Sequence, residues 1–427
     1  MTGTPDGTGT ARPRWRRLAI DTRPLRHPAY RRIFTGNSAA MFGSQFTVVA
    51  VPVQMFALTR SSLWVGYLGL AGLVPLLVLA LWGGALADVM DRRRLLLASS
   101  ALMYAGTLAL LAQAVLHLRS PVLLLVLVAA QSAGFAVAAP TQQAIIPRLV
   151  PQPEVPAANT LNYTAGTAAS VAGPLAAALL IRYDIAWAYG VDAATFTVAM
   201  WAALRLPAVP PTGAAGRRAG LGEVLSGLRY LGTSPVLMLS FAVDIVAMVL
   251  AYPRALFPAV AAERFGGPSA VGVLYAAIAV GSLLAGLTSG WISRVRRQGA
   301  ALIGAVVCWG VAVALAGLAH QLWLAVLLLA VGGAADLVSA VYRQTILQTY
   351  APDELRGRLQ GVFTIVVVGG PRLGDMRAGT SGALLGTTVA WVGGGLAAAV
   401  VAAALAVAFP ALLRYARPAG TPGPAVR

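Results

Sequence analysis

Long apolar stretches alternate with short polar ones along almost the whole chain. Each apolar stretch is long enough for a helix to cross a hydrocarbon core of about 30 Å, which takes roughly 20 residues. The apolar residues run continuously and are mostly Leu, Ala and Val, whereas a membrane β-strand alternates in polarity. The pattern predicts an all-α membrane protein with twelve transmembrane helices, over 36–59, 65–87, 95–117, 121–145, 159–181, 187–206, 235–259, 269–292, 300–319, 322–345, 359–385 and 389–413.

The predicted helices fall into two halves of six, separated by a Pro/Gly-rich segment. Two similarities at nearly constant offset indicate a duplication. "GALADVMDRRR" from Gly84 matches "GLTSGWISRVR" from Gly286, 202 residues later, and "QQAIIPRLVPQPE" from Gln142 matches "RQTILQTYAPDE" from Arg343, 201 residues later. Parallel repeats of this kind move around a central substrate site. The predicted divisions are an N-terminal arm 1–35, a first half 36–206, a cytoplasmic linker 207–234, a second half 235–413 and a tail 414–427.

Composition and charge agree with a membrane protein. Of the 427 residues, 58% are hydrophobic and 11% charged, whereas soluble domains have about 25% charged residues. The net charge of +18 comes from Arg residues that lie mostly in the connections on the side of the N-terminus. This asymmetry is typical of the positive-inside rule, so we expect a multi-pass protein of the cell membrane with both termini in the cytoplasm, and no binding to nucleic acid.

Other classes of function are disfavoured. The single Cys308 lies in an apolar stretch and offers neither a disulfide framework nor a thiolate metal site. The sequence contains no Walker loop, metal-ligand cluster or nucleophile arrangement, which argues against an enzyme or a nucleotide-driven pump. Residues 1–35 lack the apolar core of a signal peptide. We expect no cofactor and no metal, a small-molecule substrate, a lipid bilayer as surroundings and a monomer.

Several ordered motifs resemble those of a known family. "GGALADVMDRRR" is similar to the loop signature of the major facilitator superfamily. "DIVAMVLAYPRALFPA", "GWISRVRRQG", "AADLVSAVYRQTILQ", "APDELRGRLQGVF" and "GGPRLGDMRAG" together resemble the enterobactin (siderophore) exporter-like branch, over about residues 28 to 413. The resemblance implies the major facilitator fold and transport by alternating access.

The loop at the end of the second predicted helix is a candidate gate. In the resembling family its Asp holds the two halves together on the cytoplasmic side, which the resemblance assigns to Asp88, with Gly84 and Arg92 in the same loop. A carboxylate here suits the positive N-terminal end of the eleventh helix. The alternative is that these are ordinary topology charges. Val89 and Asp91 depart from the Arg and Gly that are usual at their positions, so the turn and one charge contact differ.

The fifth predicted helix contains "GTAASVAGPLAAA". Its small residues permit close helix approach, and Pro174 after Gly173 removes a helical hydrogen bond and permits a bend. The stretch partly resembles the antiporter motif of superfamily exporters. We therefore include both residues with the gate, and the motif favours export.

Charged residues within the predicted helices are the candidates for the substrate and proton sites. A charge near the bilayer centre costs about 2.5 to 3.5 kcal/mol, so it faces a cavity or a partner. The spacing of Asp336 and Arg343 puts them on one helix face, and Arg372 and Asp375 are placed to pair. The alternative to a transport role is a buried ion-pair network that braces the helices. The candidates are Asp244, Asp336, Arg343, Arg372, Asp375 and Arg377.

The chemistry of these candidates indicates an anionic ligand and a proton. Arg372 and Arg377 would provide fixed positive charge, while Asp375, Asp336 or Asp244 would exchange a proton, since the three His lie outside the predicted core. Asp192 is attributed to a helix-dipole position near the start of the sixth helix. The leading hypothesis is proton-driven export of a siderophore or similar amphipathic anion. Broad multidrug efflux is the alternative, and a non-transporting membrane scaffold or sensor is the remote one.

Overall fold

The protein is all-helical in the part of the chain that the structure describes. The computed structural model describes residues 21–206, 226, 229–413 and 415, without the side chains of 80–89, 353, 354, 356 and 357. The first group of helices consists of α1 (Pro28–Thr59), α2 (Ser62–Val89), α3 (Arg92–Val115), α4 (Pro121–Leu149), α5 (Val155–Ile181) and α6 (Ile185–Leu204). The second consists of α8 (Pro235–Leu250), α9 (Phe257–Arg264), α10 (Ser269–Leu287), α11 (Gln298–Leu318), α12 (Leu322–Tyr350), α13 (Asp353–Leu385), α14 (Thr387–Ala408) and the short α15 (Pro410–Leu413).

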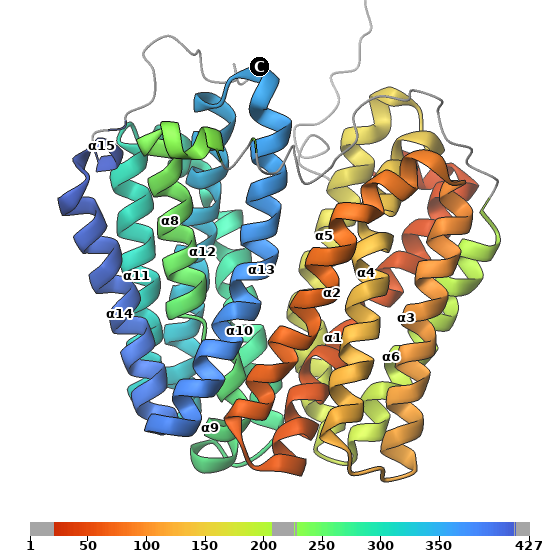
Figure 1. The fold of residues 1–427 in the computed structure, drawn as a ribbon. Helices are drawn as coiled ribbons and strands as arrows, with labels where there is room; N and C mark the ends of the chain where they lie inside the picture. Colours follow the sequence, from red (N-terminus) through yellow and green to blue (C-terminus); the bar gives the residue numbers. More distant parts are fainter. Residues whose placement is uncertain (1–20, 207–225, 227–228, 414, 416–427) are drawn as a thin grey trace, which may run out of the picture.

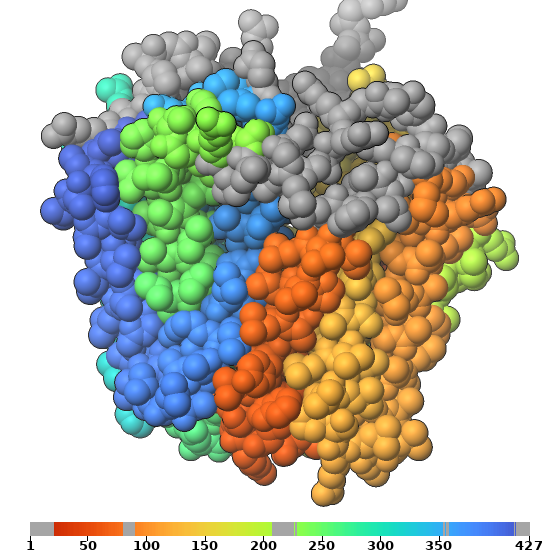
Figure 2. Space-filling model, viewed as in Figure 1, coloured from red at the N-terminus to blue at the C-terminus, as the bar shows by residue number. Residues whose placement is uncertain are grey.

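The helices form two bundles that stand side by side (Figure 1). In the first bundle α1 packs on α5 and α6, and α4 packs on α2 and α3. In the second, α11 packs on α12 and α14, while α8 packs on α13 and α14. The bundles meet chiefly where α2 lies along α13 and where α5 lies along α10. The contact of α2 with α13 is visible on the molecular surface (Figure 2).

Length and hydropathy identify these helices as membrane-spanning. Among the described residues, ten segments are long and apolar enough to cross a membrane, one of which runs from Pro235 to Arg264 and includes both α8 and α9. The helices α6 and α13, which lie alongside the others, are the two predicted spans that this criterion does not include. The prediction of an all-α, multi-pass membrane protein is confirmed.

Side-chain caps fix several helix starts in the short connections. Asp91 accepts hydrogen bonds from the backbone N–H groups of Arg93 and Arg94 and so caps α3. Asp184 accepts a hydrogen bond from the backbone N–H of Ala186 and so caps α6. These side chains satisfy amide groups that have no partner within the helix. Asp91, at a position where the resembling family usually has Gly, therefore caps the start of α3.

The predicted seventh span, 235–259, is not one continuous helix. α8 ends at Leu250, a single 3₁₀ turn (Arg254–Leu256) follows, and α9 begins at Phe257. Pro253 has no amide hydrogen to donate and disfavours helical geometry at Tyr252 before it, which accounts for the interruption. The prediction of an unbroken helix here is wrong.

Other boundaries differ from the predictions by up to two turns. α1 begins at Pro28, inside the predicted arm 1–35, and α12 continues to Tyr350. α13 runs without a break through Pro371, so the "GGP" sequence does not interrupt it. Most of the predicted linker 207–234, the arm before residue 21 and nearly all of the tail 414–427 lie outside the described residues.

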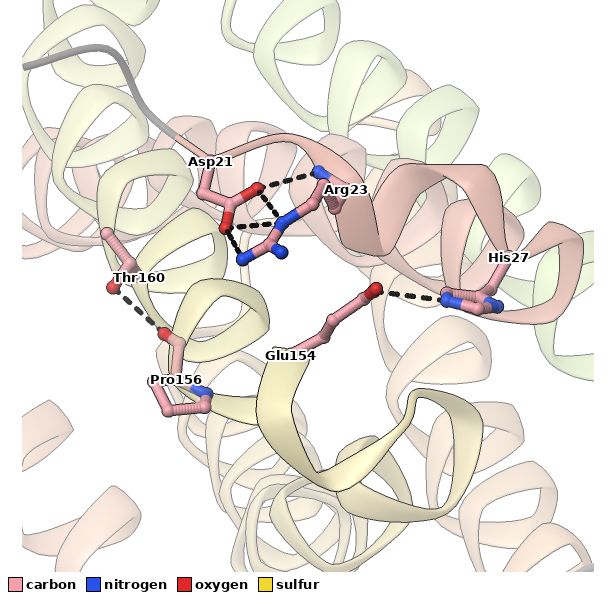
Figure 3. Close-up of polar contacts among 6 residues, drawn as sticks. All are labelled: Asp21, Arg23, His27, Glu154, Pro156 and Thr160. Atoms are coloured by element: carbon pink, nitrogen blue, oxygen red, sulfur yellow. Dashed lines mark hydrogen bonds and ion pairs between the residues drawn. The ribbon is translucent and has the colours of Figure 1, made fainter. Parts of the chain in front are cut away.

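The segment just before α1 is attached to the connection between α4 and α5 (Figure 3). The His27 Nε2 atom lies 3.0 Å from Glu154 Oε2, at the start of α5. Asp21 accepts hydrogen bonds from the Arg23 side chain in the same segment. These contacts hold the entry to α1 against the first bundle.

Candidate functional site

A cavity of about 390 Å³ lies between the two bundles. Residues of α1, α2, α3, α4 and α6 line it from one side, and the interrupted segment between α8 and α9, α10 and α13 line it from the other. Irregular backbone at membrane depth is tolerated where it lines a cavity, and in transporters such interruptions lie at substrate sites. Its charged lining residues are Asp192, Arg254, Arg372 and Asp375.

Arg254, in the interrupted segment, is held between two aromatic rings. Its guanidinium carbon lies 4.9 Å from the ring centre of Tyr252 and 5.0 Å from that of Tyr275 on α10. Its Nε atom is buried and has no hydrogen-bond partner. Cation–π contacts orient the guanidinium without using its N–H donors, so these stay available for an anion. The sequence analysis did not select Arg254, although an Arg next to Pro in an apolar run was a usable signal.

Asp375 of α13 faces this arginine. The carboxylate is within electrostatic range of Arg254 and lies close to the backbone of Ala255, the residue after Arg254. Its Oδ1 atom is buried without a hydrogen-bond partner. The interrupted segment and α13 thus bring a cation and an acid together at the cavity wall.

Arg372 does not pair with Asp375 as predicted. Its Nη1 atom donates to the backbone carbonyl of Gly72 on α2, and lies 3.3 Å from Ser132 Oγ on α4. The side chain therefore reaches from the second bundle to the first across the edge of the cavity. In this conformation Arg372 links the two bundles and also lines the first cavity.

Arg377 is directed away from both cavities. Its guanidinium donates to the carbonyl oxygens of Val249 and Leu250, at the end of α8, and to that of Ala390 on α14. The last carbonyls of a helix lack intrahelical partners and carry partial negative charge, so a cation there is favourable. In this conformation Arg377 stabilises α8 where that helix ends, and its predicted ligand-binding role stays a prediction.

A second cavity of about 540 Å³ adjoins the first, because Tyr252, Arg254 and Pro371 line both. The remaining predicted charges line this cavity. Arg343 of α12 forms an ion pair with Asp244 of α8, and its Nη2 atom lies 3.9 Å from Asp336 Oδ1. Arg343 and Asp244 are buried, whereas the Asp336 side chain is 32% exposed. The predicted proximity of Asp336 and Arg343 is found, with Asp244 as the closer partner.

Asp192 lies deeper than predicted. α6 begins at Ile185, so Asp192 is about two turns into the helix rather than at its start, and the helix-dipole explanation fails. It is buried and accepts hydrogen bonds from Thr47 of α1 and Thr107 of α3. Asp192 is therefore a buried intramembrane acid of the first bundle, which the sequence analysis did not include among the candidates.

Among the predicted gate residues, the structure gives contacts for Arg92 and Gly173 but not for Gly84 and Asp88. The side chains of Gly84 and Asp88 lie outside the described residues. Arg92 Nη1 is 3.4 Å from the carbonyl oxygen of Ala144, within the first bundle. Gly173 allows α5 to approach α1 closely, since a Cβ there would lie 2.4 Å from Gln45 Cβ.

Pro174, one residue further along α5, lies at the junction between the bundles. A Cβ on Gly272 of α10 would be 2.2 Å from the Pro174 carbonyl oxygen. On the other side, a Cβ on Gly69 of α2 would be 2.5 Å from the Arg372 carbonyl oxygen, and one on Gly379 would be 2.5 Å from the Ser62 carbonyl oxygen. Small residues let helices pack backbone to backbone in a membrane. The bundles are therefore closed together at the end where α2 and α10 begin.

We expect Gly272→Ala to shift the protein away from this closed arrangement. The added methyl group would overlap the Pro174 carbonyl, and an overlap of this kind costs about 1–3 kcal/mol, which corresponds to a population change of roughly 5- to 150-fold. The measurement is the distance between spin labels at positions 183 and 385, which lie at this end in different bundles and are exposed, after replacement of Cys308.

Gly190→Ala is the matched control, because a Cβ at Gly190 would meet no atom within 4 Å. A longer label distance in Gly272→Ala and an unchanged one in the control would agree with the expectation. Equal distances in wild type and Gly272→Ala would show that the junction accommodates a methyl group without opening.

The described residues contain no group of three or more His, Cys, Asp or Glu side chains able to hold a metal ion. The donors at the two cavities are instead arginines and isolated carboxylates, with tyrosine rings beside them. Such a set binds and orients an anionic or aromatic ligand and can exchange protons.

The sequence of this chain matches the family model described as transmembrane secretion effector over residues 20–418. The chain belongs to this family. Transmembrane secretion effectors are major facilitator transporters, so the predicted superfamily membership is confirmed and the protein is a transporter, not an enzyme.

Two relatives of this chain are both named as enterobactin exporters. The enterobactin exporter EntS of Citrobacter koseri is 29% identical over 404 residues, which cover 93% of this chain and 95% of the relative. The enterobactin exporter EntS of Shigella boydii serotype 18 is 31% identical over 367 residues, which cover 84% and 86% respectively. These relatives place the chain among the exporters of the superfamily.

Solved transporters share the fold at low sequence identity. The crystal structure of the nucleoside transporter NupG has a TM-score of 0.74 at 15% identity, covering 91% of this chain and 99% of NupG. A bacterial homologue of the iron transporter ferroportin, solved in the inward-facing state, has a TM-score of 0.67 at 14% identity, with 91% and 99% covered. These similarities concern the fold alone.

Proposed function

We propose that this secretion effector exports an amphipathic, anionic small molecule of the siderophore type across the cell membrane by proton antiport. One observation supports it above the others: Arg254 lies at the cavity between the bundles, oriented by Tyr252 and Tyr275, with an unpartnered Nε atom. A guanidinium with free donors binds carboxylates and phenolates, and tyrosine faces bind flat aromatic groups. A catecholate ligand presents both chemistries.

The relatives support the direction and class of transport. Both are named enterobactin exporters, and they match this chain over most of its length. Enterobactin or a related catecholate is therefore the first ligand to test. The substrate of this chain need not be the same molecule, since the cavity supports a negatively charged aromatic ligand as a class and not one molecule.

Alternating access has a physical basis in how the bundles meet. Arg-rich connections predict that the termini face the cytoplasm. The close glycine contacts lie at the opposite end, where α2 and α10 begin. We infer that closure at that end leaves the cavities accessible from the cytoplasm, which is the side where an exporter takes up its ligand. Release would require the glycine contacts to separate.

A broad multidrug efflux pump is the second candidate. The apolar part of the first cavity supports it, with Val51, Met103, Phe135 and Phe196 among the lining residues. Aromatic and Met side chains adapt to ligands of different shape. The charged lining favours anions over lipophilic cations, which separates the two candidates experimentally.

We expect everted membrane vesicles that contain the protein to accumulate enterobactin when an acid-inside proton gradient is applied. An exporter moves ligand into the lumen of such vesicles as protons leave. Radiolabelled enterobactin is compared with the lipophilic cation ethidium, in vesicles with and without the protein and with an uncoupler. Ethidium uptake without enterobactin uptake would favour the multidrug alternative. Uptake of neither ligand would contradict proton-driven export, and uptake that the uncoupler does not abolish would contradict proton antiport.

A further inference from the structure

Asp192 on α6 is a buried carboxylate that has no cationic partner. Only 2% of its surface is exposed, yet it is among the residues lining the first cavity. Its Oδ2 atom accepts hydrogen bonds from Thr47 at 2.5 Å and from Thr107 at 3.5 Å, while its Oδ1 atom is buried and accepts none. The carboxylate is thus contacted by neutral hydroxyl groups alone within the described structure.

The acids of the second bundle have different surroundings. Asp244 forms an ion pair with Arg343, which also lies 3.9 Å from Asp336. Asp375 is within electrostatic range of Arg254. Each of these carboxylates therefore has an arginine nearby. Among the described acids that line the two cavities, Asp192 is the one without an arginine beside it.

The titratable side chains near Asp192 on α6 and α3 are tyrosines. Tyr189 lies on α6 one turn earlier, and Tyr104 of α3 is hydrogen-bonded to Thr197 of α6. From α1 and α3 the groups in contact with the carboxylate are the Thr47 and Thr107 hydroxyls, and α4 and α5 contribute no charged contact among the described residues. The charges across the cavity, in the other bundle, are Arg254, Arg372 and Asp375.

We propose that Asp192 is the carboxylate that binds and releases the transported proton. The inference rests on the proposed proton-driven export and names its coupling site. A buried carboxylate without a cation is neutralised most directly by a proton, because its isolated charge is costly in an apolar surrounding. The Oδ1 atom, which has no hydrogen-bond partner, is the position for that proton. Its place in the first bundle separates it from the ligand-facing Arg254 in the second.

The hydrogen-bond directions at Asp192 fit a proton better than a metal ion. The Gln131 amide donates to the Thr107 hydroxyl at 3.0 Å, and this hydroxyl in turn donates to Asp192. The Thr47 hydroxyl also donates to the carboxylate. Donors therefore surround the acid, whereas a hard cation requires about six or more oxygen acceptors directed at it. One carboxylate with donating neighbours does not provide them.

The coupling test compares two kinds of transport in proteoliposomes, with enterobactin as the probe. Asp192→Asn is expected to lower proton-driven uphill accumulation by at least about tenfold, while exchange of labelled for unlabelled enterobactin falls by less than about threefold. Asp192→Glu, which keeps the acid, is expected to retain part of the coupled transport. Asp184→Asn, the same substitution in the cap of the same helix, is the matched control and is expected to match wild type.

The outcomes separate the two proposals. Normal uphill accumulation by Asp192→Asn, or equal losses of exchange and coupled transport, would overturn the role of Asp192. Accumulation driven by a sodium gradient at equal pH would overturn the assignment of a proton. Absence of exchange in the wild type would instead contradict enterobactin as substrate and leave the second measurement to decide on Asp192.

That second measurement needs no substrate. Dicyclohexylcarbodiimide reacts with protonated carboxylates in apolar surroundings. Peptide mass spectrometry of the purified protein is expected to find the label on Asp192, with labelling that increases as the pH is lowered and is absent in Asp192→Asn. Labelling of Asp375 or Asp336 but not of Asp192 across the pH range, in a folded protein, would overturn the proposal.

Discussion

Replacement of Arg254 by Gln is expected to weaken binding of an anionic catecholate by roughly 100-fold, which corresponds to about 2.8 kcal/mol. The guanidinium is oriented by Tyr252 and Tyr275, and its Nε atom is buried without a partner, so a bound anion would satisfy a donor that is otherwise unsatisfied. Dihydroxybenzoylserine and its neutral methyl ester form a matched pair of ligands. Calorimetric titration is expected to show the large loss for the acid and a change of less than about fivefold for the ester.

Arg254→Lys tests whether charge alone is sufficient. Lys keeps the positive charge but lacks the planar group that stacks on both rings, so an intermediate affinity for the acid is expected. If Arg254→Gln bound the acid and the ester with the same losses, the arginine would act through packing and not through the ligand's charge. If affinity for the acid were unchanged, the cavity's anion site would have to be sought at Arg372.

Replacement of Arg343 by Met is expected to lower the free energy of unfolding by about 3–5 kcal/mol, the usual cost of removing one partner of a buried ion pair. The substitution leaves Asp244 buried without its partner and also removes the cation near Asp336. Asp244→Leu is expected to cost less, because Arg343 keeps Asp336 at 3.9 Å. The double variant, Arg343→Met with Asp244→Leu, is expected to recover most of the loss.

Thermal unfolding of the detergent-solubilised variants measures this cycle. Arg23→Met serves as control, since it removes an exposed ion pair with Asp21 and is expected to leave the unfolding temperature unchanged. Additive losses in the double variant would show that Arg343 and Asp244 are not coupled. A stable double variant that also transports normally would assign this cluster to bracing of α8 and α12 rather than to transport.

The sequence by itself determined the helices, the membrane location and the family. Apolar length and the cost of exposing backbone to lipid are properties of a single segment, so they can be read without knowing its neighbours. The cost of an intramembrane charge is likewise local, which explains why Asp244, Asp336, Arg343, Arg372 and Asp375 all proved to line a cavity.

The partner of each charge was decided only by the tertiary structure. Arg372 donates to Gly72, 300 residues away, rather than to Asp375 on its own helix. Arg377 caps the end of α8, and this became apparent only once the helix was seen to stop at Leu250. An arginine has several donors on a long side chain, so its contact depends on which backbone groups other helices leave unsatisfied nearby.

The depth of Asp192 and the orientation of Arg254 were likewise decided by the tertiary structure and not by the sequence alone. Span boundaries predicted from hydropathy put Asp192 near a helix end, while packing against Thr47 and Thr107 places it in the interior. Hydropathy predicted an unbroken helix through Arg254, whereas the helix is interrupted there, and the second ring that contacts Arg254, Tyr275, comes from another helix. Local physics fixed which residues are costly in a membrane, and the packing of helices distant in sequence fixed which groups compensate them, because those contacts exist only after the two bundles assemble.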